Sequence, residues 1–271
     1  MEPALQRRVQ RYGWDKAASW YEACWQEQLK PAQDLLLEMA AIQPGERVLD
    51  IACGTGLVSF RVREMTGDHG FVLGTDISEK MVDLAAGIAK KKNIPAISFS
   101  RMDAELLEVP DASYDAALCA LGLMYVPDPQ QAMREMYRSL KPGGRAVAAV
   151  WGKRDHCGWA DIFDIVDQRV KSEVCPMFFH LGNPGMLPLL FEKTGFTAVN
   201  TKTISSLLLY QSGEEACMAA FAGGPVALAY HKFSEQVKNE AQAAYLDSIE
   251  KYRSGQGYAV PGEFVVAVGY K

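Results

Sequence analysis

A short apolar strand that runs into a glycine turn and then a helix is the feature that most constrains the fold of this chain. Residues 47–51 are apolar apart from their first residue and Asp50, and residues 57–65 continue with helical spacing. Strand, tight turn and helix form the first unit of a doubly wound α/β fold. Gly54 and Gly56 allow a sharp turn and close approach of a ligand, because they lack a Cβ. The unit predicts a nucleoside-cofactor site over this turn.

The spacing of the turn distinguishes two kinds of cofactor. A dinucleotide site needs G-x-G-x-x-G, in which a pyrophosphate rests on the helix N-terminus, but the third position here is Ser59. Asp50, just before the turn, would repel a pyrophosphate and suits a ligand with positive charges. S-adenosylmethionine carries an ammonium and a sulfonium, so the turn favours it over NAD.

Strand-like and helix-like segments alternate beyond this unit. We expect strands at 47–51, 71–75, 96–101, 114–119, 145–151, 197–210 and 263–270, and helices at 57–65, 79–90, 130–139 and 187–194. Such alternation predicts a mostly parallel sheet with helices on both faces. Residues 14–42 also have helical spacing, and Pro31 is expected to divide them into two helices.

Motifs along residues 45–152 resemble those of the class I S-adenosylmethionine-dependent methyltransferases. The resemblance rests on Asp50-x-Ala52-x-Gly54-x-Gly56, on 74–81, on 101–105 with Val109-Pro110, on 114–118 and on 140–145. It is strongest to the ubiquinone/menaquinone-biosynthesis type, because Leu121-Gly122-Leu123 is followed by Val126-Pro127-Asp128. The resemblance implies a Rossmann-like seven-stranded sheet of order 3-2-1-4-5-7-6 with an antiparallel last strand. Ala52 departs from the pattern, since the family has glycine there.

The resemblance also implies roles for individual residues. Asp76 would bind the ribose hydroxyls, Ile77 and Met81 the adenine faces, and Asp103 with the Ala104 N–H the adenine edge. Met81 could instead be helix core, and Asp103 could cap a turn. The other expected cofactor residues are Tyr21 on a covering helix, Asp50, Ala52, Cys53, Gly54 and Gly56 in the turn, and Ala120 and Leu121 near the methyl donor.

We treat residues 1–271 as a single domain with an N-terminal helical cover at 1–43 and a cofactor-binding core at 44–152. Segments 152–184 and 212–261 are longer than such connections usually are. They start near the carboxyl edge of the sheet, where ligands of open α/β folds bind, so we expect them to form a substrate cap. Their aromatic residues could line an acceptor pocket or form small cores of their own.

A catalytic base is poorly marked in this sequence. His156 follows the fifth expected strand and is our candidate, because a neutral imidazole can accept a proton near pH 7. A solvent-facing loop histidine would look the same in the sequence. His180 and His231, in the cap segments, are weaker candidates.

Composition excludes several classes of partner and site. A net charge of −5 argues against nucleic acid, whose binding needs a basic surface. No apolar run approaches the roughly 18 to 20 residues of a membrane span, and the scattered cysteines form no C-x-x-C pair that would suggest zinc. We expect a cytoplasmic methyltransferase that acts on a small, partly apolar organic acceptor, with no metal. The pattern does not define the oligomeric state. A binding protein without transfer activity and, less favoured, a nicotinamide-dependent oxidoreductase are the alternatives.

Overall fold

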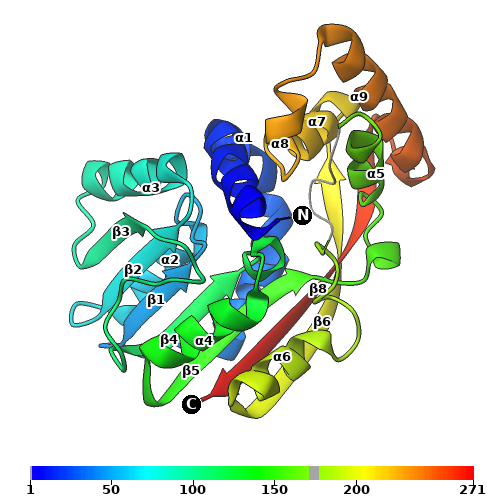
Figure 1. Cartoon of the computed structure of the whole chain (residues 1–271). Helices are drawn as coiled ribbons and strands as arrows, with labels where there is room; N and C mark the ends of the chain where they lie inside the picture. Colours follow the sequence, from blue (N-terminus) through cyan, green and yellow to red (C-terminus); the bar gives the residue numbers. More distant parts are fainter. Residues whose placement is uncertain (1, 171–176) are drawn as a thin grey trace.

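A twisted sheet forms the centre of the computed structural model, which describes residues 2–170 and 177–271 (Figure 1). Its strands are β1 (Arg47–Ile51), β2 (Phe71–Asp76), β3 (Ile97–Arg101), β4 (Tyr114–Ala120), β5 (Leu140–Trp151), β6 (Thr197–Tyr210), β7 (Arg253–Ser254) and β8 (Gly257–Tyr270). The eight-stranded sheet has the order β3-β2-β1-β4-β5-β8-β6, with β7 paired to β8. Apart from the small β7, this is the predicted order, and β8 is antiparallel to both of its long neighbours, as expected.

Helices cover both faces of the sheet. They are α1 (Pro3–Ala40), α2 (Leu57–Thr66), α3 (Glu79–Lys91), α4 (Pro129–Ser139), α5 (Asp161–Asp167), α6 (Met186–Thr194), α7 (Gly213–Cys217), α8 (Ala227–Tyr230) and α9 (Glu235–Ile249). Short helical turns are η1 (Leu123–Tyr125), η2 (Arg154–His156), η3 (Met218–Ala222) and η4 (Glu250–Tyr252). None of the helices in the two described stretches is both long and apolar enough to cross a bilayer.

Alternate strand residues divide the core between the two faces, as the period of a strand requires. On β1, Val48 packs with the C-terminal half of α1 and with α2, whereas Leu49 packs with the opposite cluster, under α4, α6 and the caps. Both clusters are continuous across the central strands. The strands are therefore apolar on both faces, which explains why they appeared as unbroken apolar runs in the sequence.

The N-terminal segment corrects one prediction. Instead of two helices divided at Pro31, residues 3–40 form one helix with Pro31 inside it. An internal proline removes one backbone hydrogen bond and costs about 3 kcal/mol. Cys24, Trp25 and Leu29 before the proline and Ala32 after it are all buried in the same core cluster. The burial of a common face on both sides of Pro31 outweighs this local cost.

Two strands start earlier than predicted. β5 was expected from 145 but begins at Leu140, because it also pairs with β4 before an irregularity, where the register shifts between Tyr114 and Ala116. β8 begins at Gly257, so the second cap segment ends before 261. β8 pairs with β6 through Pro261 and Gly262, whereas residues 141–144 of β5 have no partner in the strand ladders of the described chain.

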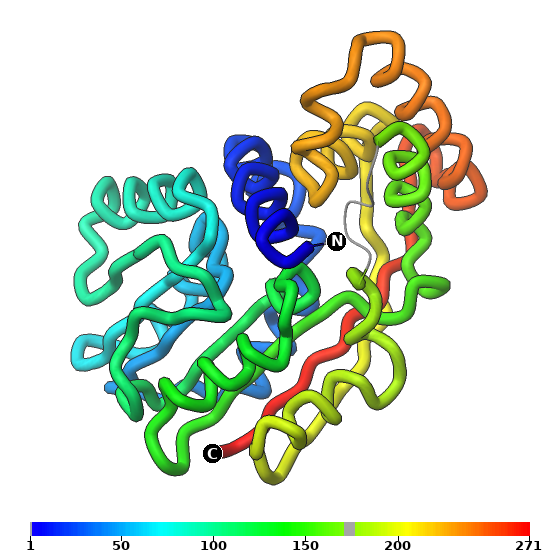
Figure 2. The backbone as a smooth tube through the Cα atoms, viewed as in Figure 1, coloured from blue at the N-terminus to red at the C-terminus, as the bar shows by residue number. Residues whose placement is uncertain are grey.

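The two cap segments form one group beyond the ends of β6 and β8 (Figure 1). α5 belongs to the first segment, and α7, α8 and α9 belong to the second. The N-terminal part of α1 lies between this group and α3, as the backbone trace shows clearly (Figure 2). Trp25 of α1 donates its indole N–H to the carbonyl of Gly223 at 2.9 Å, which attaches the second cap to the helix.

Candidate functional site

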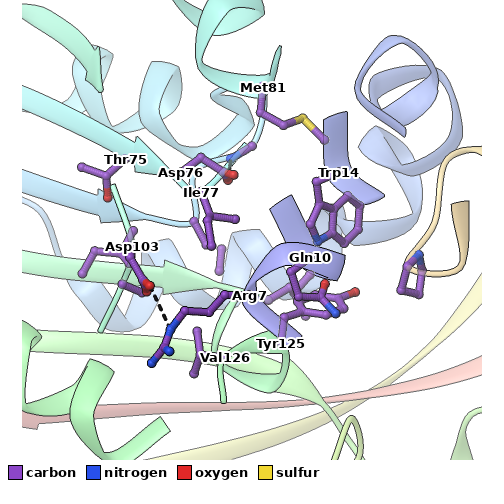
Figure 3. A pocket seen from close by; sticks show the side chains of 18 of the residues that line it. Arg7, Gln10, Trp14, Thr75, Asp76, Ile77, Met81, Asp103, Tyr125 and Val126 are labelled. Carbon is purple, nitrogen blue, oxygen red and sulfur yellow. Dashed lines mark hydrogen bonds and ion pairs between the residues drawn. The ribbon is translucent and has the colours of Figure 1, made fainter. Parts of the chain in front are cut away.

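A cavity lies at the carboxyl edge of the sheet, where the turns after β1, β2, β3 and β4 meet beneath α1 (Figure 3). Its empty volume, which includes open solvent at the mouth, is about 980 Å³. The predicted cofactor residues that line it are Tyr21, Ala52, Gly54, Asp76, Ile77, Met81, Asp103, Ala104, Ala120 and Leu121. Residues that lie far apart in the sequence thus converge on one space.

The turn after β1 has left-handed backbone at Ala52 (φ 56°), Gly54 (φ 56°) and Gly56 (φ 91°). Glycine adopts this conformation freely, but an alanine there is strained. A Cβ on Gly122 would lie 2.5 Å from the Ala52 Cβ, so the glycine after β4 leaves room for the alanine after β1. The departure at Ala52 noted in the sequence is therefore accommodated by a neighbouring strand end.

Asp50, Cys53 and Gly56 were expected at the cofactor, but the structure places them behind the cavity wall and outside its lining. Asp50 is 1% exposed and accepts a hydrogen bond from the Ser59 hydroxyl of α2 at 2.5 Å, so it faces the helix. Its other oxygen, Oδ1, has no partner among the described residues. Burial raises the pKa of Asp50 to about 7 against the opposing Ser59 hydrogen bond, and the charge of Asp76 adds to the rise.

Cys53 and Gly56 are excluded from the lining for steric reasons. Cys53 is buried, and its sulfur lies 3.0 Å from the position a Cβ on Gly74 would take. A Cβ on Gly56 would lie 2.8 Å from the Phe60 ring. Both positions therefore serve the packing of the turn against β2 and α2.

Asp76 ends β2 at the cavity wall. Its two oxygens accept the backbone N–H groups of Gly54 at 2.9 Å and Ser78 at 2.8 Å, which holds the carboxylate against the glycine turn. Burial raises the pKa of Asp76 to about 6, although these hydrogen bonds favour the charged form. Each carboxylate oxygen has a second lone pair, so Asp76 can also accept from a ligand.

Ile77 and Met81 follow Asp76 on the same wall, and Trp14, Gln10 and Tyr125 face them across the cavity (Figure 3). Met81 is 2% exposed and still lines the cavity. It therefore fits both interpretations of the sequence, as helix core and as an apolar wall.

Tyr21 of α1 lies over the glycine turn. A Cβ on Gly54 would be 3.4 Å from its ring, and Trp14 packs edge-on against it with the ring centroids 5.8 Å apart. Burial, and then the negative charge of Asp76, raise the pKa of Tyr21. The phenol therefore stays protonated near neutral pH and can donate a hydrogen bond, but it is a poor base.

The N-terminal part of α1 closes the cavity through ionic contacts that the sequence did not suggest. Arg7 Nε lies 3.0 Å from Asp103 Oδ2 and 2.8 Å from Glu105 Oε2, and Figure 3 shows its approach to Asp103. Glu105 has a side chain only 3% exposed, so Arg7 is the cation that compensates a buried carboxylate. Asp103 Oδ1 also accepts the Glu105 N–H at 2.9 Å, which is the turn cap we had kept as an alternative.

A second contact fixes the same helix to α3. Asp15 accepts the Ser78 hydroxyl at 2.7 Å and the Lys80 N–H at 3.1 Å, at the N-terminus of α3 where acidic groups are favoured. Arg7, Gln10 and Trp14 all line the cavity. Arg7 and Gln10 were missed because residues 3–13 have few apolar side chains, whereas Trp14 begins the predicted helical stretch 14–42 and was not assigned to the site. Their spacing of three and four residues on one helix face was the available signal.

Aromatic residues of the cap segments divide into two groups. Trp151 and Trp159 line the cavity, together with Trp25 and Pro225. The rings of Phe163, Phe178 and Phe179 pack behind Trp159, and Phe221 packs on Tyr230 within the second cap. Met177 is 53% exposed. Some of these aromatic residues therefore line the cavity, and others form small cores within the caps.

His156 lies in η2 outside the cavity lining. Its Nδ1 is 2.7 Å from Glu263 Oε2, and its side chain is 50% exposed. The contact attaches the first cap segment to β8. His180 and His231 are also absent from the lining, so no histidine of the described stretches reaches the cavity. The geometry gives the expected catalytic role of His156 no support.

Comparison with known proteins bears on this cavity. Residues 48–144 match a family model described as a methyltransferase domain. The chain is 34% identical over 128 residues to a demethylmenaquinone methyltransferase of Listeria welshimeri, covering 47% of this chain and 54% of that protein. The chain thus spans about half the length of the curated relatives it matches.

Solved structures share the fold. The YcgJ protein of Bacillus subtilis superposes with a TM-score of 0.61 at 19% identity, over 89% of this chain and 98% of that one. A phosphoethanolamine N-methyltransferase of Haemonchus contortus, solved with S-adenosyl-L-methionine, gives a TM-score of 0.62 at 18% identity, over 95% of this chain and 57% of that one. These likenesses extend well beyond residues 48–144.

Proposed function

We propose that the chain, whose residues 48–144 match a family model described as a methyltransferase domain, is a class I methyltransferase. It would transfer a methyl group from S-adenosylmethionine to a small, partly apolar organic acceptor. The observation that carries the proposal is the cavity at the carboxyl edge of the sheet. There Asp76 and the turn at Gly54 meet under α1, and aromatic cap residues continue the same space.

The residues at one end of the cavity fit the proposed cofactor. Asp76 is held by two backbone N–H groups and keeps lone pairs for the ribose hydroxyls. Ile77 and Met81 offer apolar surface for the adenine, and Asp103 with Ala104 its polar edge. Buried carboxylates near the turn favour a ligand with positive charges and disfavour a pyrophosphate. S-adenosylmethionine supplies an activated methyl group with a good leaving group.

The acceptor end of the cavity is mainly apolar. Trp25, Leu29, Trp151 and Trp159 come from α1, β5 and the first cap segment, and such surfaces favour a small molecule with an apolar ring or chain. The curated relative is named for a demethylmenaquinone, and a quinone-related ring is the acceptor that we would try first. A nucleic-acid acceptor is disfavoured by the net charge of −5.

The chain's own contribution to the reaction is to orient and to exclude water. α1 lies over the cavity and is fixed at Arg7 and Asp15, while the caps cover the acceptor end. Holding two reactants in an aligned geometry can by itself lower a barrier by several kcal/mol. We assign no general base, because His156 lies outside the cavity lining.

Titration calorimetry tests the cofactor. We expect one site for S-adenosylmethionine and no measurable heat with NAD, and the variant Asp76→Ala should bind S-adenosylmethionine about 5- to 150-fold more weakly, as the loss of hydrogen bonds to a charged group implies. Tight NAD binding without S-adenosylmethionine binding would mean that the chain is a nicotinamide-dependent protein. Unchanged affinity in the variant would show that the ribose site is misplaced.

Transfer is tested separately with S-adenosylmethionine labelled in its methyl group and a panel of small phenols, quinols and amines. Label should appear in an acceptor of the panel and increase with enzyme concentration. Binding of S-adenosylmethionine without transfer to any acceptor would favour the alternative, a cofactor-binding protein that acts through partner contacts.

A further inference from the structure

The indole N–H of Trp159 is a buried donor without an acceptor among the described residues. Trp159 is 3% exposed and lines the cavity. Its Nε1 makes no hydrogen bond within the part of the chain that the structure describes. A buried polar group without a partner is destabilising and rare in native proteins. Such a group beside a ligand cavity points to a partner that arrives with the ligand.

The surroundings of Trp159 explain why its neighbours supply no acceptor. Its ring packs against Trp151 at a centroid distance of 4.7 Å, and against Phe178 and Phe179 at 5.7 Å each. Another face meets Trp25 at 6.4 Å. These neighbouring rings offer no carbonyl or carboxylate. Trp159 lines the cavity, but its Nε1 is fully covered, so an acceptor atom of a cavity ligand reaches it only when a neighbouring ring shifts.

Trp25 provides an internal comparison. It also is buried and lines the cavity, but its N–H donates to the Gly223 carbonyl at 2.9 Å. The two tryptophans pack on each other. The Trp25 N–H attaches the second cap, whereas the Trp159 N–H has no acceptor within residues 2–170 and 177–271. The difference shows that the unpaired state belongs to the position of Trp159 and is not general to the aromatic cluster.

The charged groups of the cavity lie on a different part of the sheet. Asp76 and Asp103 follow β2 and β3, whereas Trp151 ends β5 and Trp159 follows it, on the other side of β1 and β4 in the strand order. The lining residues that pack on Trp159, Trp25 and Trp151, carry no charge. A neutral oxygen or nitrogen acceptor fits there better than an anion, whose desolvation a single neutral donor would not balance.

We propose that Trp159 is a specificity-determining residue that donates its N–H to a neutral oxygen, such as a carbonyl, on a flat and otherwise apolar methyl acceptor. The flat part of the acceptor packs on the rings of Trp25 and Trp151. The inference rests on the proposed function, because it assumes that the bound molecule is the methyl acceptor. Binding of such a molecule can nevertheless be tested without turnover.

The test compares two probes of nearly the same shape. 2-Acetonaphthone has a carbonyl that can accept the N–H, and 2-isopropenylnaphthalene has a methylene group in its place. Their dissociation constants are measured by equilibrium dialysis against the full chain, with and without S-adenosylhomocysteine. The ketone should bind about 5- to 10-fold more tightly to the wild type, as expected for one buried neutral hydrogen bond.

Two variants complete the design. Trp159→Phe should reduce the ratio to about one, and it breaks no hydrogen bond that the described residues make. Trp20→Phe, which changes a half-exposed tryptophan of α1 outside the cavity lining, should keep the wild-type ratio. The inference is overturned if the wild type binds both probes equally or binds neither, or if the ratio persists in Trp159→Phe. If the variant does not fold, the wild-type ratio alone decides.

The proposed function and this inference fail in different ways. S-adenosylmethionine binding is measured on the same preparation. If the chain binds S-adenosylmethionine but shows a probe ratio of one, the proposed function stands and the role of Trp159 is refuted. If the chain prefers the ketone through Trp159 but does not bind S-adenosylmethionine, the hydrogen bond of Trp159 stands and the proposed function is refuted.

Discussion

Replacing Asp50 by asparagine should have little effect on stability at pH 5 and should stabilise the protein at pH 8. Asp50 is buried, with one oxygen bonded to Ser59 and the other without a partner in the described chain. An asparagine side chain would keep the shape and can accept the same Ser59 hydrogen bond through its oxygen. The substitution therefore removes a buried charge and leaves most of the packing intact. Its cost is an amide NH₂ without an acceptor in place of Oδ1.

The magnitude follows from the pKa of this carboxyl. Burial raises the pKa from 3.8 to about 7, and each pH unit of such a difference is worth about 1.4 kcal/mol. Because the folded pKa is the higher one, the unfolded state loses its proton first as the pH rises. The free energy of unfolding then falls between about pH 4 and 7, by roughly 4 kcal/mol in all and about 3 kcal/mol of it above pH 5. Asp50→Asn should lose that slope.

Urea denaturation of the cofactor-free protein at pH 5 and pH 8 measures the pH dependence of stability and the cost of the unpaired amide. An unpaired amide costs about 1 to 3 kcal/mol, so we expect near-equal stability at pH 5 and an advantage of about 2 kcal/mol for Asp50→Asn at pH 8. Asp76, with a pKa raised by burial to about 6, contributes a smaller fall in both proteins. Asp83→Asn on the exposed face of α3 is the control and should leave the slope unchanged. A pH slope in Asp50→Asn as steep as in the wild type would show that Asp50 is not the titrating group.

Three further outcomes are expected, each measured by urea denaturation. Ala52→Gly should raise the free energy of unfolding by up to about 1 kcal/mol, because it relieves left-handed backbone; a loss would mean that the alanine methyl contributes more through packing. Gly56→Ala should lower it by at least about 1 kcal/mol, because its Cβ would lie 2.8 Å from the Phe60 ring at φ 91°, and a neutral result would contradict the tight turn. Arg7→Gln should lower it by about 1 to 3 kcal/mol by leaving buried Glu105 without its cation, whereas Arg11→Gln, in a 3.5 Å surface pair, should change it by less than about 1 kcal/mol.

Local pattern predicted the strands and helices of the core well, because each of them is defined by short-range features. β1 and β2 were expected at 47–51 and 71–75 and lie at Arg47–Ile51 and Phe71–Asp76. Their apolar runs are bounded by glycine turns, which terminate them in any tertiary context. The same holds for α3, whose N-terminus is capped by Ser78 through the Met81 N–H.

Features that depend on contacts between distant segments were harder to predict. Pro31 predicts a break by local energetics, but α1 continues through it because its face is buried on both sides. Arg7 was overlooked because its importance depends on Glu105, 98 residues away in the sequence. A local sequence pattern cannot show that two residues so far apart in the sequence lie close together in space.

The glycine turn, the acidic end of β2 and the strand order that brings them to one edge could all be predicted from the sequence. These follow from backbone rules that act over a few residues and from family resemblance. The directions of individual side chains could not be predicted and emerged with the tertiary packing. Asp50 is turned toward Ser59 and away from the cavity, and Trp159 is surrounded by aromatic rings so that its N–H has no partner in the described chain. Side-chain direction and hydrogen-bond satisfaction depend on which distant segments pack together, and that is a property of the whole fold.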